Sequence, residues 1–92
     1  MVKLNRFDSV WDALESDPVK AENMKLRSAL MIAIGGHIEE MKLTQVEAAK
    51  KLHITQPRVS ALIKGKIEEF RLDTLINMAH RLGLHVTMKI AA

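Results

Sequence analysis

Two short apolar segments, separated by a tight turn, constrain the fold more than any other feature of the chain. The first follows Thr44, a residue that favours helix N-caps, and places small and apolar side chains at helical spacing up to Leu52. The second follows Thr55, has Pro57 in its first turn and ends at Gly65. This pattern predicts two helices of about two turns each on either side of a tight turn.

Residues 45–64 have the spacing of a helix-turn-helix, whose second helix is held at a fixed angle so that it enters the major groove of DNA. Small or apolar residues stand where the two helices must touch: Ala48, Ala49, Leu52, Ile54, Val59 and Leu62. The helical period turns another set outward, with Arg58 on its flank: Gln56, Pro57, Ser60, Ala61 and Lys64. Side chains on this face can bond base edges or phosphates, so we favour DNA contact over a merely solvated surface.

Apolar periodicity predicts three further helices, over roughly 8–15, 18–41 and 72–82. Gly35 and Gly36 interrupt the longest one at roughly 1 kcal/mol each relative to Ala, which marks a bend or a close contact with another helix. We therefore expect an all-α bundle of about five helices. Its domain organisation is an N-terminal extension (1–17), a DNA-binding domain (18–83) and a C-terminal segment (84–92).

The C-terminal segment is predicted to form a single strand, because apolar and polar residues alternate strictly over 84–90. A lone strand exposes its backbone N–H and C=O groups and so requires a partner. We expect pairing with the same strand of a second subunit in a homodimer; folding back on a loop or adding to a partner protein's sheet are the alternatives. The expected dimerisation residues are Leu84, Val86, Met88 and Ile90.

Composition narrows the function. The 92 residues contain no cysteine, which excludes disulfides, thiolate metal sites and a cysteine nucleophile. No spacing suggests a metal site, a cofactor or a converging catalytic group, and no apolar run is long enough to cross a membrane, so we expect a soluble cytoplasmic protein that is not an enzyme. Residues 1–42 carry six basic and seven acidic side chains, whereas residues 43–92 carry eight and four, so an anionic partner is expected to meet the second half.

The motif Leu-Thr-Gln-x-x-Ala-Ala at 43–49, followed by 55–65 and by a Leu-rich helix ending at Gly83, resembles the Cro/CI or XRE family of helix-turn-helix regulators. The resemblance implies a lambda-repressor-like bundle and a palindromic operator in double-stranded DNA. With Phe70 and a terminal Leu-Gly-Leu-x-Val, the chain is more narrowly similar to small HigA-like antitoxins. Those proteins inhibit RelE/HigB-type ribonuclease toxins and repress their own operons. A stand-alone phage-like repressor without a toxin is the alternative.

The resemblance also implies individual roles. Gln45 matches a phosphate-clamping glutamine and Gln56 a base-reading glutamine, and His53 stands where the family usually has Gly, at a turn position that favours positive φ. The full set of expected DNA contacts is Thr44, Gln45, Thr55, Gln56, Arg58, Ser60 and Lys64. The expected toxin is a small basic protein. Its expected contact is an apolar stripe within the acidic stretch 7–17, formed by Phe7, Val10, Trp11 and Leu14. The same stripe is equally suited to covering the apolar face of the long helix.

Overall fold

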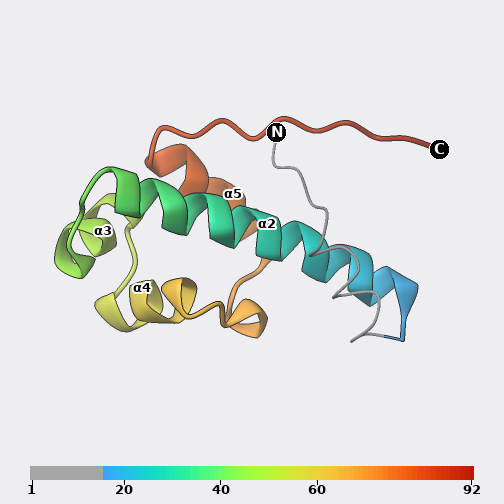
Figure 1. Ribbon diagram of the computed structural model, residues 1–92, viewed down its shortest axis with the longest axis horizontal. Helices are drawn as coiled ribbons and strands as arrows, with labels where there is room; N and C mark the ends of the chain where they lie inside the picture. Colours follow the sequence, from blue (N-terminus) through green and yellow to red (C-terminus); the bar gives the residue numbers. More distant parts are fainter. Residues whose placement is uncertain (1–15) are drawn as a thin grey trace.

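The computed structural model describes residues 16–92. Within them the chain forms four α-helices and one turn of 3-10 helix (Figure 1). In chain order these are α2 (Pro18–Glu40), α3 (Gln45–Leu52), α4 (Gln56–Ile63), η1 (Ile67–Glu69) and α5 (Leu72–Arg81). The predicted bounds of these helices are confirmed to within a residue, whereas η1 was not predicted. The helix expected over 8–15 lies outside the described residues.

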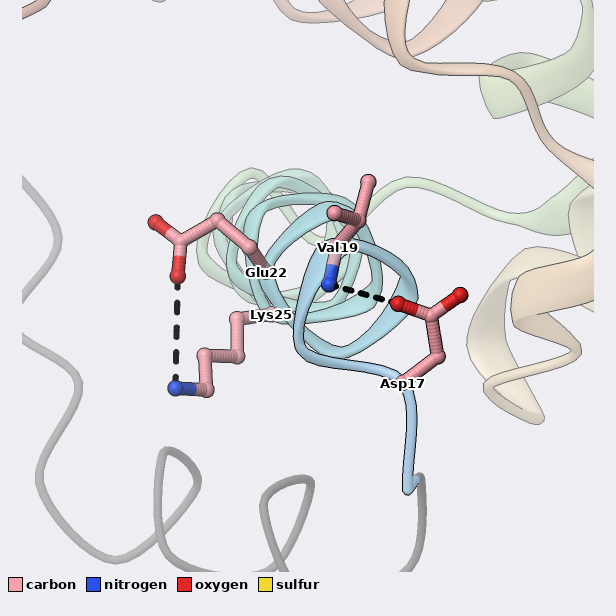
Figure 2. A network of polar contacts seen from close by, with 4 residues as sticks. All are labelled: Asp17, Val19, Glu22 and Lys25. Atoms are coloured by element: carbon pink, nitrogen blue, oxygen red, sulfur yellow. Dashed lines mark hydrogen bonds and ion pairs between the residues drawn. The ribbon is translucent and has the colours of Figure 1, made fainter.

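An N-cap residue followed by a proline begins α2, the long helix that runs the length of the molecule (Figure 1). The Asp17 carboxylate accepts a hydrogen bond from the Val19 N–H at 2.9 Å, and Pro18 occupies the first turn, where a missing N–H does no harm (Figure 2). One turn further, Lys25 forms an ion pair with Glu22 at 4.0 Å. None of the helices in the described residues is long and apolar enough to span a membrane.

The expected interruption of α2 at Gly35 and Gly36 is wrong. The helix continues through both residues, and a Cβ placed on either would meet no atom within 4 Å. No neighbouring helix of the described chain therefore requires glycine here, and the helical hydrogen bonds of a long, packed helix outweigh the low propensity of two residues.

One apolar core joins the helices. The middle of α2 packs against α5 and α4, and α3 packs against α4 and α5. The largest fully buried side chains come from all of these elements: Phe70, Ile34, Leu52, Leu75, Met78 and Val59. This arrangement fixes α3 and α4 on a support made by α2 and α5.

All four helices end in the same left-handed turn. The residues with positive φ are Lys42 (55°), His53 (58°), Gly65 (76°) and Gly83 (84°). After each of them, the next N–H donates to the carbonyl five residues back, at 2.9–3.2 Å, which closes the helix with a Schellman motif. The positive φ predicted at His53 is confirmed.

The C-terminal strand predicted over 84–90 is wrong, and with it the strand-paired dimer in the expected fold. No strand forms within residues 16–92, so this part of the chain is all-helical. Alternating polarity sets which side chains share a face, but a strand also requires a neighbouring backbone, and the described chain offers no second extended segment to pair with. Leu84 packs on the core, whereas Val86, Met88 and Ile90 are exposed by 46%, 80% and 86%.

Candidate nucleic-acid interface

The helices α3 and α4 pack closely through small and apolar side chains. Ala48, Leu52 and Val59 have no exposed surface, and Ala49 and Leu62 are also buried. A methyl group at each alanine lets the backbone of α4 approach that of α3, since a larger side chain would push the helices apart. Five of the six expected contact residues of the helix pair are thus confirmed as core, and the sixth, Ile54, is partly buried and packs against it.

The turn between the two helices is tightly held. His53 lies at φ 58° and ψ 42°, its N–H donates to the Lys50 carbonyl at 3.4 Å, and the Ile54 N–H donates to the Ala49 carbonyl at 3.1 Å. The Leu52 carbonyl accepts from Nη1 of Arg81 on α5 at 3.2 Å. Because α5 thus bonds the last residue of α3 directly, the turn is anchored to the bundle as well as to its own helix.

The N-terminus of α3 carries a complete capping box. The Thr44 hydroxyl accepts from the Glu47 N–H at 3.1 Å, and the Glu47 carboxylate accepts from the Thr44 N–H at 2.9 Å. The bond from the Thr44 backbone, together with Thr44's hydroxyl and the nearby Lys50 and Lys51, lowers the pKa of Glu47 below its ordinary value. Glu47 is therefore charged at neutral pH.

The capping box determines which hydrogen-bond donors at the start of α3 remain available to bind an anion. The amides of Gln45 and Val46 have no acceptor among the described residues, whereas the Thr44 hydroxyl already interacts with both the amide and the carboxylate of Glu47. The Glu47 charge offsets the positive end of the helix dipole. A phosphate here would be held by individual donors, with little help from the dipole.

The N-terminus of α4 presents its first residue to solvent. The Thr55 hydroxyl accepts from the Arg58 N–H at 3.4 Å, and Pro57 has no N–H to satisfy. The amide of Gln56 therefore has no acceptor in the part of the chain that the structure describes, and its side chain is exposed. Backbone donor and side-chain amide both face solvent at the tip of the helix.

Arg58 makes a contact that the sequence did not predict. Its guanidinium carbon lies 4.6 Å from the centroid of the Phe70 ring, over the ring face. Phe70 is 1% exposed and follows directly after η1. Arg58 is half-buried as a result. The only signal in the sequence was an aromatic residue in an otherwise aromatic-poor chain, and nothing in its spacing linked it to α4.

The expected DNA contacts lie at three places on the motif. Thr44 and Gln45 are exposed at the start of α3, and Thr55 and Gln56 at the start of α4. The remaining three are Arg58 and Ser60, both half-buried, and Lys64, exposed at the C-cap of α4. At 1.5 Å per residue, Lys64 is about 12 Å along the helix from Gln56. Gln56, Ser60 and Lys64 recur every four residues along one side of α4, whereas Arg58 lies about 200° around the helix from Gln56, over Phe70.

The outward position expected for Ala61 is wrong, because Ala61 is 6% exposed and belongs to the core. The helix α4 packs against α2 as well as against α3, so two of its sides are covered. Outside this interface, no three His, Asp or Glu side chains of residues 16–92 gather as metal ligands. The stripe Phe7, Val10, Trp11 and Leu14 lies outside the described residues.

Basic residues gather at the C-terminal ends of both helices of the motif: Lys50 and Lys51 in the last turn of α3, and Lys64 and Lys66 just after α4. All four are exposed. They account for much of the positive excess in the second half of the chain, which suits a polyanion.

Comparisons with known proteins agree with this geometry. A family described as a helix-turn-helix domain matches residues 15–91, a range that includes α2 to α5. A solved structure described as an XRE family transcriptional regulator has 33% sequence identity and a TM-score of 0.74, and the match covers 79% of this chain and 82% of that chain. No curated protein matches.

Proposed function

Because this chain belongs to the XRE family of helix-turn-helix domains, we propose that it is a DNA-binding transcriptional regulator that represses from a sequence-specific operator. The observation that carries this proposal is the start of α4, where an exposed Gln56 stands at the tip of a helix packed against α3 and α2, with α3 in turn bonded to α5. A recognition helix needs this rigidity, because a base-edge hydrogen bond tolerates little error in distance or angle. The proposal includes no enzymatic activity and no cofactor.

In this function Gln56 reads a base, since its side-chain amide has the donor and the acceptor that pair with adenine in the major groove. Thr44, Gln45 and Thr55 donate to phosphates on either side of the groove. Ser60 and Lys64 continue the contact along α4, with Lys64 as a point charge near the backbone. The exposed lysines at the C-terminal end of each helix add affinity that does not depend on sequence.

The regulator acts as a homodimer in this proposal, because two half-sites about 34–36 Å apart match one turn of DNA and a palindromic operator. The exposed apolar side chains Val86, Met88 and Ile90 are the candidate dimer contacts. Leu84 is already packed on its own core and contributes less than expected.

The test begins with selection of a preferred sequence from random DNA duplexes by the full chain, followed by binding measurements on the selected and a scrambled duplex. Gln56→Ala is expected to weaken binding to the selected duplex by about 1–3 kcal/mol and to leave the scrambled duplex unchanged. Lys64→Ala is expected to weaken both and to reduce the salt slope by about 1. Lys20→Ala, an exposed residue at the start of α2, is the matched charge control. Failure to enrich any sequence would refute the proposal.

The second part of the proposal is a more specific role as an antitoxin. This role rests on the sequence of residues 7–17. Four acidic residues, no basic residue and the stripe Phe7, Val10, Trp11 and Leu14 suit a small basic protein such as a ribonuclease toxin. Trp11→Ala is expected to abolish copurification of a toxin co-expressed from a neighbouring reading frame while operator affinity stays within two-fold. A stable dimer with no copurifying protein would instead support a stand-alone repressor.

A further inference from the structure

The contact between Arg58 and Phe70 joins the recognition helix to a segment outside the motif. The guanidinium carbon lies 4.6 Å above the ring centroid, a separation at which a cation is attracted to the ring face. No residue in 16–92 accepts a hydrogen bond or forms an ion pair with this guanidinium. The ring is therefore the described group that orients it.

Phe70 is itself held from a third element. Its ring is 1% exposed, so it has no freedom to turn toward solvent. The Arg27 side chain on α2 donates from Nη1 to the carbonyls of Ile67 and Phe70, at 3.2 Å and 3.4 Å. The backbone on both sides of the η1 turn is thus bonded to the longest helix, and the ring face under Arg58 is fixed relative to the bundle.

The stacking geometry leaves the N–H donors along the edge of the Arg58 guanidinium available for hydrogen bonds. An arginine carries five N–H donors in the plane of its guanidinium, whereas the ring occupies only one face of that plane. A stacked guanidinium can therefore still donate two parallel hydrogen bonds to O6 and N7 of a guanine. An unsupported arginine would first have to give up its rotamer freedom to do so.

On this geometry we propose that Phe70 is a positioning residue that presents Arg58 as a second base reader on the same helix as Gln56. The inference rests on the proposed function, since it concerns sequence-specific DNA. Arg58 determines specificity at one base pair, and Phe70 makes that contact effective without touching DNA.

A double-mutant cycle tests the role, with the ratio of affinities for the selected and the scrambled duplex as the readout. In the wild-type background, Phe70→Leu is expected to lower this ratio by about two- to five-fold, the size of one cation–π contact. In the Arg58→Gln background, Phe70→Leu is expected to leave the ratio unchanged. A purely structural role for Phe70 would reduce the ratio equally in both backgrounds, and that result would overturn the inference.

A second measurement uses the unmodified chain, so it does not depend on how well Phe70→Leu folds. The Arg58 side-chain protons lie over the ring face and are expected to show upfield ring-current shifts by NMR that persist in the complex with the selected duplex. Shifts that vanish on binding would show that Arg58 leaves the ring, and would overturn the inference while the regulator function stood. Absence of any selected sequence would overturn the regulator function, and this inference with it.

Discussion

The left-handed turn at His53 gives the sharpest test of how the recognition helix is held. At φ 58° and ψ 42°, a residue with a Cβ is less stable than glycine by roughly 1–2 kcal/mol, and His tolerates the region better than most. Glycine removes this strain but adds about 0.4–1 kcal/mol of unfolded-chain entropy. Since the His53 side chain is exposed, little packing is lost on replacing it. We expect His53→Gly to stabilise the domain by about 0.5 kcal/mol.

The opposite substitution makes the argument quantitative. His53→Val places a β-branched side chain in the left-handed region, and we expect a loss of at least about 1 kcal/mol. The Gly and Val variants at position 53 are then separated by about 1.5 kcal/mol, or roughly 6–12 °C in melting temperature for a domain of this size. Both thermal and urea denaturation resolve a difference of that magnitude.

A matched position in a regular helix supplies the control. Asn23 is exposed within α2, where valine is a better helix former than glycine by a few tenths of a kcal/mol. The order of stability of the Gly and Val variants should therefore reverse between positions 23 and 53. If valine proves as good as glycine at position 53, the left-handed turn is not the feature that limits this site, and the reasoning fails.

Three further predictions concern the support of the motif. Arg27→Met is expected to destabilise the domain by about 1–2 kcal/mol in urea denaturation, because two carbonyls of the η1 region lose their donor. Leu75→Ala is expected to cost about 2–5 kcal/mol by the same assay, whereas Ile76→Ala, at a side chain that is 38% exposed, costs far less. Glu47→Gln is expected to make the free energy of unfolding depend less on pH in the acid range. Folding lowers the pKa of the Glu47 carboxyl, so this group stabilises the wild-type domain above its ordinary pKa of 4.5. That stabilisation is lost as the pH falls through the folded pKa, and the Gln variant lacks it at every pH. Melting curves across this range check it, and an unchanged acid limb would contradict it.

The helix boundaries were predictable because their signals are local. Asp17 and Thr44 bond amides only two or three residues away, and Thr55 does the same for α4. The left-handed residues close helices through carbonyls at most five residues back. An interaction confined to one helical turn is fully contained in a short stretch of sequence, so its pattern identifies it without knowledge of the rest of the fold.

The wrong predictions share the opposite property. Strand formation over 84–90 depends on a second backbone that the described chain does not provide, and the alternating pattern carries no information about it. Ala61 was assigned outward from the single buried face that α3 covers, yet α2 lies against α4 as well. In both cases the outcome depends on what packs against the segment, which periodicity within the segment does not contain.

The orientation of the candidate site also depends on contacts between distant parts of the chain. Gln56 is identified from the motif alone, but the turn before it is bonded by Arg81, 29 positions beyond Leu52. The segment that carries the Phe70 ring is bonded by Arg27 from 43 positions away. Isolated helices of eight residues are not stable in water, so a peptide limited to 44–65 would contain the proposed motif contacts without the geometry to use them. The sequence of the motif therefore specifies which groups meet DNA, and the surrounding bundle specifies where they point.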